Sequence, residues 1–253
     1  MPNISARRGG WNAGAIWRIA CTTVSIAVVE TLVCGAAALP LVLFWIELAA
    51  WTTTSNVGTR AVAFSLAIIP SYVAFALCLM VASPIATRLT GARTPPDAEM
   101  PIVDMGWPLM RWARYMVASH IVRTIAGSLF RGSPLWTVYL RLNGARIGKR
   151  VYVNTLFISD HNLLEIGDDI VIGSEVHLSG HTVEAGIVKT AKVRLERGVT
   201  IGLGTIVDIG VVVGAGCQVG ALSLIPKYTR LDGGAVYAGI PVRRIDRHSP
   251  ADT

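Results

Sequence analysis

Charged residues are scarce in this chain of 253 residues: they make up 15% of it, while apolar residues make up 52%. Soluble globular domains usually carry about 25% charged residues, so the composition argues against a wholly soluble protein and predicts a membrane part. Negatively charged residues are scarcer than positively charged ones, with 16 Asp and Glu against 23 Lys and Arg. The net charge of +7 therefore favours anionic partners.

Cysteine is also rare, and no two of the four cysteines have the spacing of a CxxC motif or of a disulfide framework. Three lie inside apolar runs and the fourth, Cys217, lies inside a repeat described below. We interpret all four as small buried apolar side chains. Serines such as Ser174, Ser179 and Ser223 lack the sequence context of a nucleophile elbow, so nothing indicates a serine-centred reaction.

Two long apolar stretches dominate the first hundred residues, from Ile19 to Ile46 and from Ala61 to Ala86. Each exceeds the roughly 20 residues that cross a bilayer. A cleaved signal peptide would have a shorter apolar core and would not be followed by a second span. The sequence therefore predicts a transmembrane helical hairpin over residues 1–88.

Arginines flank this hairpin unevenly, which predicts its orientation. One arginine, Arg60, lies in the connecting loop, whereas several lie outside the two spans, namely Arg7, Arg8, Arg18, Arg88, Arg93, Arg111 and Arg114. By the positive-inside rule both ends face the cytoplasm, so we expect a two-span protein of the cell membrane. Glu30 lies within the first span and needs a partner, either a polar lipid substrate or a hydrogen bond between helices.

Residues 89–146 form a basic segment with interspersed aromatic residues. Polar, proline-bearing residues 90–105 predict a linker, and apolar residues at helical spacing from Trp107 onward predict an amphipathic helix. Nucleic acid binding would also explain basic and aromatic residues together. Beside membrane spans the pattern is more typical of an interfacial anchor on anionic lipid, so we expect membrane lipid and no nucleic acid as partner.

The second half is built from a six-residue repeat, which reads "LERGVT IGLGTI VDIGVV VGAGCQ VGALSL IPKYTR" from Leu195. The first position of every hexad is Leu, Ile or Val, and the fifth is usually a small residue. Hexads also occur from Ile147 and from Ile166. Such repeats predict a solenoid, because each short strand buries its apolar side only by stacking on the next coil.

This half resembles the hexapeptide-repeat acyltransferases, and the ending "VYAGIPVRRI" from Val236 resembles the glycine-proline-basic ending of that family. The resemblance implies an all-β left-handed parallel β-helix over residues 147–246, followed by a tail at 247–253. It also implies a homotrimer with active-site clefts between neighbouring subunits. The donor would be an acyl-coenzyme A, most commonly acetyl-coenzyme A, or a carrier-protein thioester, and no metal is expected.

A narrower resemblance concerns the stretch "SPLWTVYLRLNGARIGKRVYVNT" from Ser133. It is similar to the membrane-linked terminal region of polylysine-synthetase-like non-ribosomal peptide synthetases. This chain lacks an adenylation or carrier domain, so the peptide-forming activity of those large enzymes is not carried over.

The repeat loses its register after Leu178, because seventeen residues rather than a multiple of six separate Leu178 from Leu195. A loop must therefore leave the coil between about Gly180 and Lys192. In the family such a loop covers the cleft, and His181 matches the histidine beside it that acts as general base. Attack on a thioester requires the acceptor to lose a proton, which an imidazole accepts near neutral pH.

Further residues complete the expected site. His177, last in its hexad, is expected to line the cleft, and Glu184 is either the residue that orients the His181 imidazole or an exposed loop residue. Gly202 and Gly204 permit backbone amides to approach an oxyanion closely. The resemblance assigns the phosphates of coenzyme A to basic residues near the end of the chain, namely Lys227, Arg243 and Arg244, for which attraction to lipid head groups is the alternative.

Two other functions stay open at this point. The histidines at 161, 177 and 181 also resemble, less closely, the zinc ligands of gamma carbonic anhydrases, which would make the protein a hydratase. A non-catalytic scaffold that only trimerises a membrane protein would tolerate loss of His181. The prediction favoured by the sequence is a membrane-anchored acyltransferase that acts on a hydroxyl or amine of an acceptor near the membrane.

Overall fold

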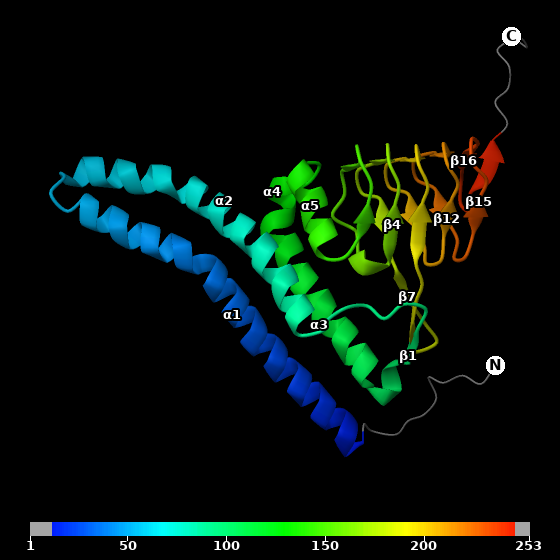
Figure 1. Cartoon of the computed structure of the whole chain (residues 1–253), viewed down its shortest axis with the longest axis horizontal. Helices are drawn as coiled ribbons and strands as arrows, with labels where there is room; N and C mark the ends of the chain where they lie inside the picture. The colour runs from blue at the N-terminus through cyan, green and yellow to red at the C-terminus, as the bar shows by residue number, and fades with distance from the viewer. Residues whose placement is uncertain (1–11, 246–253) are drawn as a thin grey trace, which may run out of the picture.

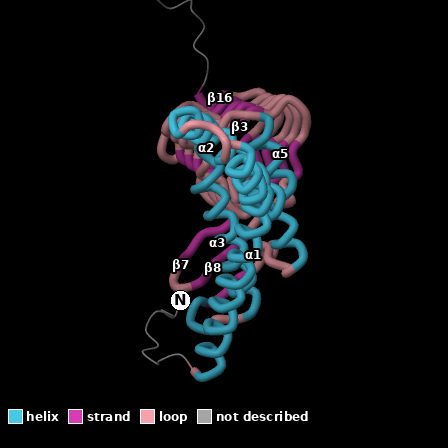
Figure 2. Tube along the Cα trace, turned by 90° about the vertical axis from the view of Figure 1, so that its left-hand side faces the viewer, coloured by secondary structure: helices cyan, strands magenta, loops and turns pink. Residues whose placement is uncertain are grey.

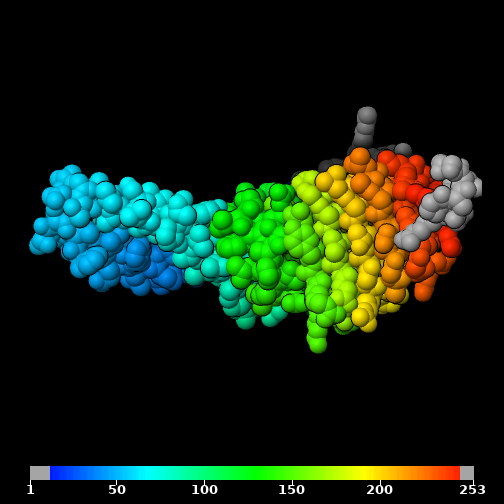
Figure 3. All heavy atoms as spheres, turned by 90° about the horizontal axis from the view of Figure 1, so that it is seen from above, coloured from blue at the N-terminus to red at the C-terminus, as the bar shows by residue number. Residues whose placement is uncertain are grey.

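The computed structural model describes residues 12–245, and it is elongated, with its main parts following one another along the long axis (Figures 1 and 3). A pair of long helices lies at one end, a layer of shorter helices follows, and a stack of β-coils forms the other end (Figure 1). The expected C-terminal tail at 247–253 and the arginines Arg7 and Arg8 lie outside the described residues.

The hairpin consists of α1 (Ala13–Trp51) and α2 (Val57–Leu89). Asn12 and Asn56 cap the two N-termini by accepting hydrogen bonds from the amides of Ala15 and Thr59. At 1.5 Å per residue, α1 is about 58 Å long, so it exceeds the apolar thickness of a bilayer. Both helices are long and apolar enough to cross a membrane.

Apolar side chains are exposed along the hairpin, and its near half also packs on the rest of the protein. Val33, Ala37, Ala76 and Leu79 belong to one core that continues through the helical layer into the coils. The exposed side chains towards the tip include Val42, Leu43, Phe44, Ile46, Trp51, Val57, Val62, Leu66, Ile68 and Ile69. Exposing this large apolar surface to water would cost much free energy.

The helical layer joins the hairpin to the coils. It comprises α3 (Trp107–Val122), a π-helical turn η3 (Arg123–Gly127), α4 (Ser128–Phe130) and α5 (Pro134–Leu142). The predicted amphipathic helix is thus present as α3, but it contacts α1 and α2 and also packs Leu109 and Met110 against Met100 and Val188. Protein rather than lipid therefore covers much of its apolar side, which the sequence alone did not indicate.

Residues 146–245 form stacked coils with three faces, each face a sheet of short parallel strands. One sheet has the order β15-β12-β9-β4-β2, the second β17-β16-β13-β10-β5-β3 and the third β14-β11-β6. Only β17 pairs antiparallel among these strands. Their bounds are β2 (Arg146–Ile147), β3 (Tyr152–Val153), β4 (Leu164–Ile166), β5 (Val171–Ile172), β6 (His177–Leu178), β9 (Val193–Leu195), β10 (Thr200–Ile201), β11 (Ile206–Val207), β12 (Val212–Val213), β13 (Gln218–Val219), β14 (Leu224–Ile225), β15 (Arg230–Leu231), β16 (Val236–Ala238) and β17 (Arg243–Ile245).

The repeat sets the coil length. Leu195 pairs with Val213 and Val213 with Leu231, so that three hexads make one turn of 18 residues. The aliphatic first positions point inward and are buried, as is Cys217 at a fifth position. Burial raises the pKa of the Cys217 thiol to about 11, which keeps it protonated at neutral pH. Cys217 is therefore part of the core, as predicted.

Two segments leave this regular coil at the end nearest the helices. The first is a single 3-10 turn, η4 (His161–Leu163). The second is the predicted loop, which is a β-hairpin of β7 (His181–Glu184) and β8 (Ile187–Thr190) that also pairs with β1 (Glu99–Pro101) from the linker (Figure 2). The short turn η2 (Ile102–Asp104) follows β1 and leads towards α3.

Candidate functional site

The two irregular segments bring together a histidine and an aspartate. Asp160 lies directly before η4 and His181 is the first residue of β7. Parallel pairing of Ile158 with Leu178 sets the two segments side by side. The Nδ1 atom of His181 lies 2.5 Å from Oδ2 of Asp160, and the histidine side chain is 21% exposed while the carboxylate is fully buried.

Helical and linker residues hold the buried carboxylate from the other side. The Thr94 hydroxyl donates to Oδ1 of Asp160 at 2.6 Å, and the Trp112 indole N–H donates to the same oxygen at 3.1 Å. The Trp112 ring also meets the His181 ring edge-on at 5.1 Å between centroids. Asp160 adopts φ 52°, a left-handed conformation that Asp tolerates better than most residues.

These partners decide the charge of Asp160. Burial acts to raise the pKa of its carboxyl, but the hydrogen bond and charge of His181, with the Thr94 hydroxyl, together hold that pKa below its ordinary value. Asp160 is therefore a carboxylate at neutral pH. Because a carboxylate only accepts hydrogen bonds, Nδ1 of His181 is the donor in this pair, which leaves Nε2 outside the contact with Asp160.

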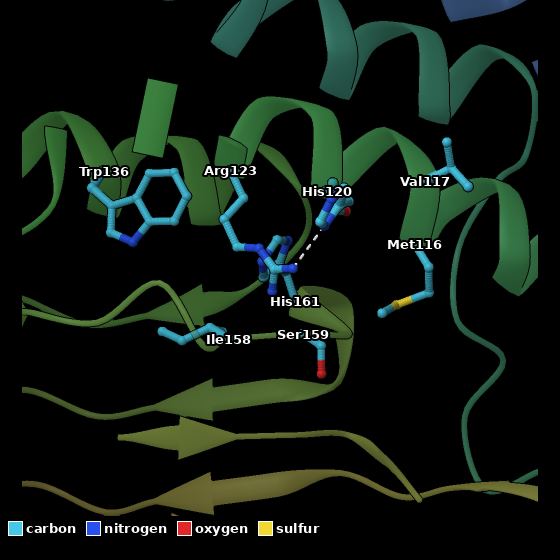
Figure 4. A pocket seen from close by; sticks show the side chains of 9 residues that line it. Met116, Val117, His120, Arg123, Trp136, Ile158, Ser159 and His161 are labelled. Carbon is cyan, nitrogen blue, oxygen red and sulfur yellow. Dashed lines mark hydrogen bonds between the residues drawn. The ribbon is translucent and has the colours of Figure 1, made fainter. Parts of the chain in front are cut away.

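A largely apolar cavity of about 290 Å³ lies beside this pair, between α3 and the first coils. Met116, His120 and Arg123 line it from the helices, and Ser159 and His161 line it from the coils (Figure 4). Arg123 donates to Nδ1 of His120 at 2.8 Å, as the dashed line in Figure 4 marks. Ser159 connects the cavity to the pair, since its hydroxyl is 3.1 Å from that of Ser179, which is 3.3 Å from Nδ1 of His181.

His177 and Glu184 lie apart from the Asp160–His181 pair. His177 is exposed on the outer side of β6, where its ring stacks on Phe157 with centroids 4.5 Å apart. Glu184 is at the far end of β7 and forms ion pairs with Lys227 and, at 3.9 Å, with Lys189. Asp160 therefore contacts the imidazole at the place where the sequence suggested Glu184.

Gly202 and Gly204 have a different role in the coil from the one the sequence suggested. The amide of Gly202 donates to Val219 O at 2.8 Å and that of Gly204 to Ser174 O at 2.9 Å, so both donors are used between coils. A Cβ on Gly202 would lie 2.5 Å from the Ala221 nitrogen, so this glycine is needed for close stacking. The geometry supports stacking of the coils for this pair rather than donation to an oxyanion.

The basic residues assigned to coenzyme A lie towards the C-terminal end. Arg243 and Arg244 are exposed on β17, and Lys227 follows β14 and pairs with Glu184. This ion pair ties the β7–β8 hairpin to the coil stack.

His161 is an internal residue rather than a partner of His181. Its Nδ1 lies 2.8 Å from the Tyr115 hydroxyl, and burial lowers its pKa to about 4, which leaves it neutral. Within residues 12–245 no group of three or more His, Cys, Asp or Glu side chains is placed to hold a metal ion. A zinc site of the kind considered above would need ligands from another subunit.

Comparison with known proteins gives the same relatives as the sequence motifs. No family model matches the chain. The chain is 27% identical over 136 residues to the delta-poly-L-ornithine synthetase of Acinetobacter baumannii (strain AB307-0294). That match covers 54% of this chain and 10% of the synthetase, so the chain spans about a tenth of the length of this curated relative.

Solved structures similar to part of the chain include acetyltransferases. One from Vibrio cholerae, complexed with acetyl-coenzyme A, is 22% identical, with 41% of this chain and 60% of that chain covered and a TM-score of 0.38. A galactoside acetyltransferase in complex with coenzyme A is 19% identical, with 56% and 84% covered and a TM-score of 0.41. A maltose O-acetyltransferase from Clostridium difficile 630 is 19% identical, with 51% and 86% covered and a TM-score of 0.37.

Proposed function

We propose that this chain is a membrane-anchored acyltransferase in which His181 is the general base and Asp160 its orienting carboxylate. The observation that carries the proposal is the 2.5 Å contact between Nδ1 of His181 and the buried Asp160. An imidazole fixed in this tautomer accepts a proton at Nε2 from the attacking hydroxyl or amine, as in other histidine-carboxylate pairs. No covalent intermediate on the enzyme is needed.

The balance of the reaction is simple. The acceptor oxygen or nitrogen forms a bond to the acyl carbon while its proton passes to Nε2 of His181. The carbon-sulfur bond of the thioester then breaks, and the leaving sulfur takes that proton back from Nε2, so that the donor departs as a free thiol and His181 is regenerated. The donor is an acyl-coenzyme A, with acetyl the first choice, or the corresponding carrier-protein thioester, as the complexes of the solved relatives suggest.

The left-handed β-helix and the homotrimer belong to the same proposal. The outer side of the β6-β11-β14 sheet and its turns carries exposed apolar side chains, including Phe157, Leu203, Ile206 and Leu222. The outer side of the β15-β12-β9-β4-β2 sheet is mainly charged instead, with Arg146, Glu165, Arg194 and Arg230. Association through the apolar face would bury it and would enclose the clefts beside His181.

Membrane anchoring is supported by the hairpin, whose far half exposes apolar side chains on both helices. The coil stack then lies on the cytoplasmic side, and β7, which begins at His181, belongs to the end of the stack nearest the helices (Figure 1). This position favours an acceptor that is lipid-linked or otherwise close to the bilayer.

Ligand-dependent stability of the detergent-purified chain tests this function. A ligand that binds only the native state raises the melting temperature by mass action. We expect a saturable increase with acetyl-coenzyme A or a longer acyl-coenzyme A. A response to zinc alone would instead support the hydratase, and no response to any ligand would support the scaffold.

A further inference from the structure

A second cavity, of about 550 Å³, lies where the hairpin meets the coils, and it is lined by three arginines from three different segments. Arg88 belongs to the last turn of α2, Arg93 to the linker and Arg111 to α3. Polar groups of Asn143 and Asn162 complete the wall. Cavities of this size are typical of small-molecule sites.

The charge of this cavity is not balanced by protein groups. Among the described residues that line it none is acidic, and these three arginines form no ion pair within residues 12–245. Arginines elsewhere on the same molecule do pair with carboxylates, namely Arg131, Arg146, Arg150, Arg194 and Arg197. The three arginines therefore line one cavity without a counter-charge, which favours a bound anion.

The neighbouring groups leave arginine donors for such an anion. Asn143 donates its side-chain amide to Tyr139 O at 3.0 Å, and Asn162 donates to Thr94 O at 2.8 Å. Arg88 donates one N–H to Leu142 O at 2.7 Å, which fixes the position of its guanidinium group. Most of the arginine N–H groups remain for a ligand, and a phosphate matches their planar, forked geometry best.

The position of the cavity indicates where that phosphate comes from. Ile85 and Leu89 are 51% and 83% exposed on the same last turns of α2 that carry Arg88. An apolar surface and an arginine cavity thus meet at one level of the hairpin, as acyl chains and phosphates do at the surface of a bilayer. Basic pockets beside membrane spans on the cytoplasmic side bind anionic lipid head groups in this way.

We propose that this cavity binds the phosphate of an anionic lipid head group, with Arg88, Arg93 and Arg111 as its ligands. The inference rests on the membrane anchoring proposed above but not on acyl transfer. A bound lipid would hold the linker against the coils, because Thr94 bonds both Asn162, which lines the cavity, and Asp160. The lipid site and the proposed catalytic pair thus share one anchoring residue.

The test is a thermal titration of the full chain in a neutral detergent with water-soluble dihexanoyl phosphatidic acid. We expect a saturable rise in melting temperature, and a roughly tenfold higher half-saturating concentration for Arg111→Gln. Arg230→Gln removes the same charge from the outer side of β15 and should leave the titration unchanged. Arg93→Gln, in the linker, provides a second variant in case Arg111→Gln does not fold.

Two further ligands fix the source of the phosphate. Dihexanoyl phosphatidylcholine, which is zwitterionic, should stabilise the protein far less than phosphatidic acid. Inorganic phosphate that reproduces the phosphatidic acid response at the same concentration would overturn the lipid assignment, and equal responses of wild type and both pocket variants would overturn the site. Acetyl-coenzyme A, titrated on the same samples, reports separately on the acyltransferase, so the two proposals can fail independently.

Discussion

The coils from Leu195 to Leu231 and the coils from Ile147 to Lys192 share one six-residue repeat, but they differ in what they carry. The later coils are regular, with pairs 18 residues apart and apolar inward positions. The earlier coils are interrupted twice, by η4 and by the β7–β8 hairpin, and each interruption contributes one member of the Asp160–His181 pair. Regular coils form the stack, and the departures from them carry the proposed catalytic pair.

The reason is physical. A regular coil directs aliphatic side chains inward and leaves little room for a buried charge, which is stable only when it is paired and hydrogen-bonded. Asp160 meets that condition because three partners from three segments, Thr94, Trp112 and His181, bond its two oxygens. Only an interrupted coil that touches the helical layer offers those partners together.

Asp160→Asn, in the interrupted coils, is expected to change the catalytic rate most. The amide leaves the shape of the site intact but no longer fixes the proton on Nδ1 of His181, so we expect kcat to fall roughly 10³- to 10⁴-fold. Asp208→Asn makes the same change in a regular coil, where the carboxylate accepts from the following amide, and should leave kcat nearly unchanged. Steady-state release of coenzyme A thiol measures both, and similar rates for the two variants would contradict the assigned role of Asp160.

A smaller effect is expected when the helical layer no longer supports the carboxylate. Thr94→Val keeps the shape of the side chain and removes the 2.6 Å hydrogen bond to Asp160, so kcat should fall about tenfold with little change in KM for the acyl donor. Thr94→Ser retains the hydroxyl and should recover most of the rate. Equal kinetics of Val and Ser variants would show that Thr94 only fills space.

In the regular coils a substitution should affect stability alone. A Cβ at Gly214 would lie 2.6 Å from the Gly233 nitrogen, so Gly214→Ala must displace neighbouring backbone and should destabilise the fold by about 1–3 kcal/mol. Gly35→Ala places the same methyl group in α1 where nothing lies within 4 Å, and it is the control. Melting temperature and kcat are measured together. A fall in kcat of the folded Gly214→Ala protein would contradict the claim that the regular coils contribute to stability alone.

The last prediction concerns the pH dependence of stability and His161, which lies in the interrupted coils but outside the pair. Its folded pKa of about 4 is below the ordinary 6.5, so the unfolded chain binds the extra proton first as the pH falls. The stability from this group is complete above about pH 6.5 and is lost towards pH 4, by of the order of 3 kcal/mol. Melting temperatures from pH 7 to 4.5 should therefore fall less steeply for His161→Asn, and parallel curves would contradict the assignment.

The sequence predicts the regular region better than the interrupted one. Six hexads in one register predict the stacked coils, and the seventeen residues after Leu178 predict the excursion, whereas His181 was assigned by the family resemblance. Asp160 was missed, although a signal was present: thirteen residues rather than twelve separate the first hexad positions Val153 and Ile166. That second break in the repeat is visible in the sequence. The contact of Asp160 with His181, 21 residues later, is not visible there, because it depends on how two irregular turns pack.

The helical layer shows a different limit. Apolar spacing predicts α3 as a helix, but amphipathicity does not say whether lipid, another helix or a coil covers the apolar side. The indole N–H of Trp112 on Asp160, and the three arginines that meet in one cavity, arise from packing of segments up to about 50 residues apart. Such contacts are set by tertiary structure and leave no local pattern.

Acyl transfer by the reconstituted full chain tests the central claim most directly. Labelled acetyl-coenzyme A is incubated with the protein in membranes that contain a total lipid extract, and label in the lipid fraction is compared between wild type and His181→Ala. The account predicts transfer by wild type and background labelling by the variant, with both proteins equally membrane-bound and folded. Equal labelling by the two proteins would contradict His181 as the base and with it the proposed mechanism.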